Sequence, residues 1–264
     1  MGHIRIGRLP ATRRWRELIG LISEAGEVSR VAEATTHAWG LAFNKVRNDP
    51  GFREAVYLLT QVGAAGKSKD PAKQLDAAGL DVGHAGSAVE VAVALSQAME
   101  RRIQGAHERS DFGELAQRAL ISAVTERLQE EIGPRLIQPG PQELRSAVKE
   151  CGKAKGFSEL SKAFFARLTN ECLNYFLSKT LPAQVGERRR FANTEQLAEF
   201  EKAMRTHCSE AAEIVGDYSA DWLSKNYYES GGNIGRDEAE KFGWYGLEKI
   251  RQELEERARE DVKN

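Results

Sequence analysis

The chain has 264 residues, 29% of them charged, and a formal net charge of −1 at pH 7. With so little net charge, no whole-molecule field draws the protein to nucleic acid or to a membrane, so such a partner would have to meet a local patch. No stretch reaches the roughly 18 consecutive apolar residues of a membrane span, so no membrane partner is expected. The three cysteines (Cys151, Cys172 and Cys208) have no Cys-x-x-Cys spacing, which favours a reducing, cytoplasmic location over a disulfide framework.

Apolar residues recur with the helical period of 3.6 in nearly every segment. In the segment 49–62, Asp49 stands at a capping position and Pro50 at the first helical position. One face of that helix is apolar: Phe52, Ala55, Val56, Leu59 and Val62. Further helices are expected at 12–24, 29–47, 71–79, 141–152, 157–180, 194–228 and 235–260.

Two more helix starts have the spacing of a capping box. Ser87 with Glu90 precedes "VAVALSQAM", and Asp111 with Glu114 precedes "LAQRALISAV". Together these patterns predict an all-α protein, a helical bundle of about nine or ten helices.

A proline- and glycine-rich stretch, "GPRLIQPGP" at 133–141, cannot be continuous helix. We interpret it as a linker between two helical subdomains. The N-terminal region would span 1–132 and include a basic arm at 1–16, and the C-terminal region would span 142–264. A long loop within a single domain is the alternative.

The stretch "VGAAGKSKD" at 62–70 carries the end of a phosphate-binding P-loop motif. A P-loop needs a glycine five residues before Gly66, so that a wide turn of N–H groups wraps the phosphates, but that position is Gln61. The segment 63–70 is therefore expected to be a connector after a helix. No other cofactor motif occurs, so no cofactor is expected.

Two acidic features could suggest metal binding. The segment 227–238 ends like a calcium loop, but its early ligand positions are occupied by Tyr227, Glu229 and Gly231, so a plain turn between helices is expected. An acidic stripe lies along the expected helix 194–228: Glu210, Glu213, Asp217 and Asp221. Without histidines at helical spacing, it is expected to be a solvated face.

Two basic segments could bind phosphates or acidic protein surfaces. The N-terminal arm contains arginines around a tryptophan that could stack on a base: Arg5, Arg8, Arg13, Arg14, Trp15 and Arg16. A second patch is formed by Arg188, Arg189 and Arg190. Trp15 also has the apolar spacing of a core residue.

The expected helix 235–260 is amphipathic, with a seam of Leu247, Ile250 and Leu254. The seam is short for a coiled coil, so it either packs on its own chain or docks on another protein chain.

The sequence therefore favours a non-enzymatic helical interaction subunit of a bacterial multiprotein assembly. An antiviral defence or nucleic-acid-processing complex is one compatible setting, although no residue points to it. The alternatives are a helical nucleic-acid-binding protein that uses the arginine-rich arm, and an enzyme whose site assembles from distant residues.

Overall fold

The structure is a computed structural model that describes residues 13–23, 26–36, 48–106, 109–133, 140–178 and 180–261; of residues 13–16, 23, 106 and 261 it describes only the backbone. Within these ranges the chain is helical, without a named strand, which confirms the predicted all-α bundle. The α-helices are α1 (Arg13–Ser23), α3 (Pro50–Lys67), α4 (Pro71–Ala77), α5 (Ala88–Ala106), α6 (Asp111–Ile132), α7 (Pro141–Cys151), α8 (Ala154–Leu177), α9 (Thr194–Ala211), α10 (Glu213–Glu229) and α11 (Arg236–Asp261). A 3-10 helix, η1 (Pro182–Gln184), and helical residues 28–36 complete the described part.

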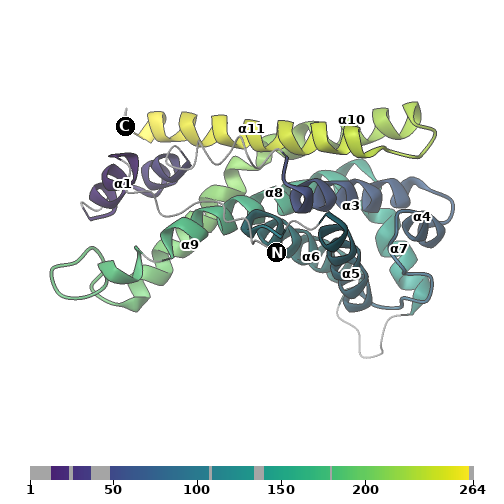
Figure 1. The fold of residues 1–264 in the computed structure, drawn as a ribbon, viewed down its shortest axis with the longest axis horizontal. Helices are drawn as coiled ribbons and strands as arrows, with labels where there is room; N and C mark the ends of the chain where they lie inside the picture. The colour runs from purple at the N-terminus through teal and green to yellow at the C-terminus, as the bar shows by residue number, and fades with distance from the viewer. Residues whose placement is uncertain are drawn as a thin grey trace.

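The helices are arranged around α3 and α8 (Figure 1). Helix α11 lies along one side of the molecule and packs on α3, while α4, α5 and α7 gather at one end. Helices α8 and α9 pack together and run toward a projection at the other end. The loop that joins α8 to α9 lies at this projecting end.

Helix α3 is enclosed on nearly all sides. The sequence predicts one apolar face, but the structure buries nearly the whole helix between Gly51 and Ala65, leaving Arg53 exposed and Tyr57 half-buried. Among the described helices, those that pack on it include α4, α5, α6, α7, α10 and α11. A helix with apolar residues on all sides is stable only when other helices surround it. Helix α3 is therefore the central helix of the bundle.

Helix α3 continues through the glycines to Lys67, which corrects the expectation that 63–70 is a connector. A Cβ atom on Gly66 would lie 2.3 Å from the backbone nitrogen of Gly152, and one on Gly63 would lie 2.5 Å from the Phe157 ring. Glycine is thus needed where neighbouring helices approach α3 closely. The N–H groups of this segment serve the helix, so they do not form a phosphate-binding loop.

The N-caps of α3 and α6 each cap their own helix and are hydrogen-bonded to each other. Asp49 caps α3, since its Oδ1 accepts a 2.9 Å hydrogen bond from the backbone nitrogen of Phe52. Ser110 caps α6 through a 2.9 Å bond from the backbone nitrogen of Gly113, so the predicted cap Asp111 is one residue too late. The Ser110 hydroxyl also donates to the Asp49 carboxylate, which joins the two helix starts.

The start of α5 has the predicted capping box. The backbone nitrogen of Glu90 donates to the Ser87 hydroxyl at 3.3 Å, and the Glu90 carboxylate accepts from the backbone nitrogen of Ser87 at 2.9 Å. These bonds stabilise the charged carboxylate, so the pKa of Glu90 lies below its usual value, chiefly because of a further bond from the backbone nitrogen of Gly86.

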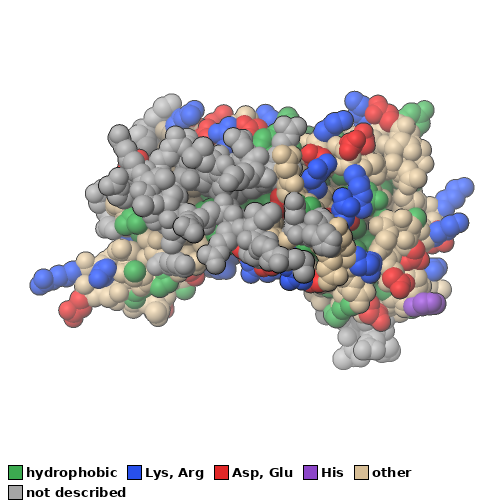
Figure 2. Space-filling model, viewed as in Figure 1, with side chains coloured by type: hydrophobic (Ala, Val, Ile, Leu, Met, Phe, Trp, Pro, Cys, Tyr) green, Lys and Arg blue, Asp and Glu red, His purple; other side chains and the backbone are tan. Residues whose placement is uncertain are grey.

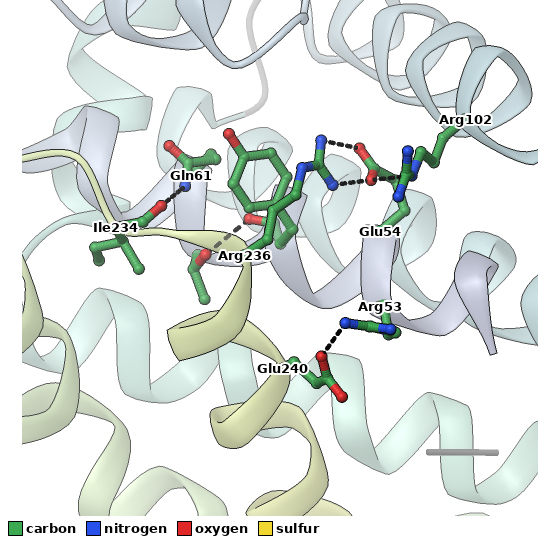
Figure 3. Close-up of polar contacts among 9 residues, drawn as sticks. Arg53, Glu54, Gln61, Arg102, Ile234, Arg236 and Glu240 are labelled. Carbon is green, nitrogen blue, oxygen red and sulfur yellow. Dashed lines mark hydrogen bonds and ion pairs between the residues drawn. The ribbon is translucent and has the colours of Figure 1, made fainter. Parts of the chain in front are cut away.

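A buried carboxylate fastens the start of α11 to α3 (Figure 3). The Glu54 side chain is only 4% exposed and accepts two hydrogen bonds from the Arg236 guanidinium. Arg102 of α5 adds a longer ion pair at 3.6 Å, and the Arg236 guanidinium lies 3.9 Å from the centre of the Tyr57 ring. A buried charge is tolerated only when it is paired in this way, so the cluster fixes α11 at one position along α3.

Two further contacts hold the same interface. The Gln61 amide donates to the backbone oxygen of Ile234 at 3.0 Å, and Arg53 forms an ion pair with Glu240 (Figure 3). Residues near the start of α11 therefore contact α3 along much of its length.

The predicted helix 194–228 is two helices. Helix α9 ends at Ala211 and α10 begins at Glu213. The N–H group of Ala212 bonds to carbonyl groups of the last turn of α9, and its φ and ψ angles of −82° and −7° depart from those of a regular helix. No glycine or proline marks this break, which is why the apolar pattern runs through it.

Residues on both sides of 133–141 share one hydrophobic core. Helices α3 and α6 from the first region pack on α7, α8 and α11 from the second. Residues 134–139 lie outside the described part, and the shared core is what a loop within one domain would produce.

Candidate interaction surface

The N-terminal arm falls largely outside the described residues. Arg5 and Arg8 are not described, and Arg13, Arg14, Trp15 and Arg16 lie in the first turns of α1, where only their backbone is described. Further along α1, Leu18 and Ile22 are buried. The binding role of the arm therefore stays a prediction.

The second basic patch lies in the loop between α8 and α9. Arg190 faces inward: its guanidinium donates to the backbone oxygens of Ile22 at 3.2 Å and Gly26 at 2.6 Å, and lies 4.4 Å from the centre of the Phe200 ring. Arg188 and Arg189 are exposed. Figure 2 shows basic side chains at the tip of the projection at the left of the view. Arg190 thus anchors the loop to α1, and the other two arginines face solvent.

The seam of α11 packs within the chain. Leu247, Ile250 and Leu254 are 3%, 2% and 1% exposed and belong to the shared core. A docking role for these side chains would require α11 to leave its place on the bundle.

The cysteine thiols are buried and not poised to react. Burial raises the pKa of Cys151 and of Cys208 to about 12, and raises that of Cys172 well above its usual value. A thiol is nucleophilic as its thiolate, so these groups are inert at neutral pH.

The acidic stripe is exposed and partly used in ion pairs. Glu213 pairs with Lys162, and Glu210 pairs with Arg257 at 3.0 Å. Asp217 and Asp221 are exposed. Across the described residues, no group of three or more His, Cys, Asp or Glu side chains could hold a metal ion. The described helices also include none long and apolar enough to cross a membrane.

An exposed apolar pair lies on α5. Val89 is 60% exposed and Val93 is 50% exposed, one helical turn apart. Spacings of four, three, four and three residues join them in one row with Ser96, Glu100 and Ile103. Residues at such spacing share one side of a helix, so the row runs along the length of α5.

Helix α6 lies beside the C-terminal part of this row. The Gln117 amide of α6 donates to the Ser96 hydroxyl of α5 at 3.2 Å, which fixes the register of the two helices. A hollow of about 410 Å³ opens between them, lined by Glu100, Ile103, Arg109, Ser110, Glu114, Gln117 and Arg118. One turn beyond Gln117, Ile121 is only partly buried. The row and this hollow together are called the α5–α6 face below.

Sequence reasoning missed the α5–α6 face, although a signal was present. In "AVEVAVAL" at 88–95 every residue except Glu90 is apolar. A helix on the surface of a bundle turns only one side toward the core. Some side chains of such a run must therefore be exposed to solvent or covered by a partner.

Comparisons with protein-family models, with curated proteins and with solved structures give no match to this chain. The α5–α6 face is therefore interpreted from its own chemistry.

Proposed function

We propose that the protein is a non-enzymatic binding component of a multiprotein assembly and that its α5–α6 face contacts another protein chain. The exposure of Val89 and Val93 supports this proposal most directly. Exposed valine does not stabilise the chain that carries it, because it buries little apolar area and its helix propensity is lower than that of alanine by roughly 0.5 kcal/mol. Burial against a partner would give both side chains a role.

The cellular setting of this assembly is a separate proposal. We propose a bacterial protein located in the cytoplasm; the three buried free thiols support the location, because they suit a reducing compartment.

The experiment that tests this function compares retained partners. The tagged wild type, the double variant Val89→Gln/Val93→Gln and a control, Tyr228→Gln, are used to capture proteins from an extract of the source cells. Tyr228 is 87% exposed and lies on α10, none of whose residues lines the hollow of the α5–α6 face. Partners bound in amounts matching the protein should be lost only in the double variant. Equal recovery with all three proteins would contradict the proposal.

A second candidate function is nucleic-acid binding through the loop between α8 and α9. Arg188 and Arg189 are exposed, and the loop between α8 and α9 that carries them lies at the projecting end of the molecule (Figure 1), where they could contact phosphates. Binding to short DNA or RNA should then weaken linearly with the logarithm of salt concentration and be lost in Arg188→Glu/Arg189→Glu. Binding that is absent, or is unchanged in this variant, would eliminate the loop as a nucleic-acid site.

A further inference from the structure

A hollow beside the contact between α8 and α9 is lined by more basic than acidic side chains. The two helices pack together (Figure 1), and the hollow has a volume of about 480 Å³. Lys162 and Arg167 of α8 and Arg205 of α9 line it, together with a single acid, Glu159. The hollow is called the α8–α9 hollow below.

The spacing of residues on α8 explains why space is left open here. The residues that line the hollow from α8 are three, one, three, one and three positions apart, which places them on one side of the helix: Glu159, Lys162, Ala163, Ala166, Arg167 and Asn170. The two alanines, in the middle of this side, are too small to fill the space toward α9. The longer side chains therefore line the rim of the hollow, and the two alanines line its bottom.

Two of the basic groups are paired, but their partners lie outside the hollow. Lys162 pairs with Glu213 and Arg167 pairs with Glu126. Both carboxylates are more than half exposed, whereas both basic side chains are less than a third exposed. Exposed carboxylates are well hydrated and form weak ion pairs, so they neutralise the more buried cations only in part.

The hydration of these cations is also reduced. Burial lowers the pKa of Arg167, because water can no longer fully solvate its positive charge. An anion placed in the hollow would replace the missing water with direct hydrogen bonds.

The third basic group, Arg205, is available to a ligand. Its side chain is exposed and, among the described residues, takes part in no ion pair or hydrogen bond. Two hydroxyl groups from the same helix, those of Thr206 and Ser209, line the hollow beside it. A guanidinium with adjacent hydroxyl donors matches the oxygens of a phosphate group.

We infer that the α8–α9 hollow binds the phosphate group of a small-molecule ligand, which Arg205, Arg167 and Lys162 hold from two helices. Thr206 and Ser209 would donate further hydrogen bonds to its oxygens. The negative charge of Glu159 opposes the binding of an anion. Removing this charge should therefore strengthen binding. The hollow and the α5–α6 face have no lining residue in common, so this inference is independent of the proposed function.

A small ligand fits this hollow better than a polymer does. Nucleic acid is bound by several basic groups that follow the regular spacing of its phosphates, whereas here the basic groups surround one space. An acidic peptide could place one carboxylate there and is the competing occupant.

Titration calorimetry with inorganic pyrophosphate at constant ionic strength tests the inference on the full chain. We expect one site with a dissociation constant below about 1 mM, a modest affinity for a small anion. A glutamate-rich peptide should bind at least about tenfold more weakly. Absence of pyrophosphate binding at about 10 mM, or tighter binding of the peptide, would overturn the inference.

Three single variants separate the hollow from general electrostatic attraction. Arg205→Gln should weaken pyrophosphate binding about tenfold, the loss expected for a hydrogen-bonded charge, because no other group replaces its guanidinium. Glu159→Gln should strengthen binding about twofold, since it removes the acid from the hollow. Lys202→Gln is the matched control: it removes one positive charge from an exposed position of α9 that does not line the hollow.

The control decides the outcome. Lys202→Gln should change the affinity by less than about twofold. Equal losses in Lys202→Gln and Arg205→Gln would show that the anion is attracted only by the charge of α9, which would overturn the site. Neither outcome of these binding measurements bears on the proposed partner at Val89 and Val93, which is tested separately.

Discussion

Two apolar rows of this molecule have similar spacing and opposite surroundings. The row on α11 (Leu247, Ile250 and Leu254) is almost completely buried, whereas Val89 and Val93 on α5 are at least half exposed. The row on α11 has an obvious role in stability, because burying a large aliphatic side chain contributes about 1.5–3 kcal/mol. Val89 and Val93 make no comparable contribution.

The surroundings of the two rows explain this difference. Helix α11 is held on α3 by the ion pairs of Glu54 and Arg53 before its row begins, so its apolar side packs against the core. Helix α5 already buries its opposite side, including Val91 and Leu95, and its second apolar strip faces outward. Apolar spacing in the sequence therefore identifies the apolar side of a helix. Whether that side is buried depends on how the other helices of the chain pack around it.

The strongest test of this contrast places charges in both rows. Ile250→Asp/Leu254→Asp should abolish cooperative unfolding, because two unpaired carboxylates in the core cost more than the roughly 5–15 kcal/mol that stabilises a typical domain. Circular dichroism during heating is the measurement. Val89→Asp/Val93→Asp is the control and should melt cooperatively. A folded Ile250→Asp/Leu254→Asp protein would show that the α11 row is not part of the core.

Introduced cysteines measure the same contrast kinetically. The native thiols give little background, because burial holds the pKa of Cys151 and Cys208 at about 12. At pH 8, Val93→Cys should react with a thiol reagent at least about 100-fold faster than Ile250→Cys, which must wait for local opening. The rate for Val93→Cys should rise with pH up to the usual thiol pKa near 8.5, as thiolate forms. Similar rates at the two positions would contradict the assigned burial.

A further variant tests the ion-pair cluster of Glu54, Arg236 and Arg102 at the start of α11. Arg236→Gln leaves the buried Glu54 carboxylate with only the longer contact to Arg102. Because the Arg236 side chain is 47% exposed, the expected loss is about 2 kcal/mol, below the 3–5 kcal/mol typical of a broken buried pair. Urea unfolding gives the value.

The control for that variant is Arg251→Gln. Arg251 pairs with Glu248 and Glu255 of its own helix, so its replacement should cost no more than about 0.5 kcal/mol. Equal losses in the two variants would mean that the Glu54 cluster has no special role.

The smallest effect is expected for the valines themselves. Val89→Gln/Val93→Gln should change the free energy of unfolding by less than about 0.5 kcal/mol, because neither side chain is buried. Urea unfolding checks this value in the protein without its partner. A loss above about 2 kcal/mol would show that the chain itself uses this row.

The sequence was sufficient for the class of fold because the helix starts carry local signals. Asp49 with Pro50, and Ser87 with Glu90, form the predicted caps. The break at Ala212 has no local signal, and the continuation of α3 depends on Gly66 meeting Gly152, a contact between distant residues. The exposed side of α5 was missed for the same reason: which of two apolar strips faces inward depends on where α6 lies.

The enclosure of α3 also affects how the chain can fold during synthesis. Glu54 and Arg236 are 182 residues apart, so α3 leaves the ribosome well before the helix that covers one of its sides. At the usual 5–20 residues per second, this delay is roughly 10–40 s, during which part of an apolar helix has no cover. Until α11 (Arg236–Asp261) has emerged from the ribosome, the nascent chain should therefore be recognised by chaperones that bind exposed apolar segments, and it should be released once α11 has packed on α3.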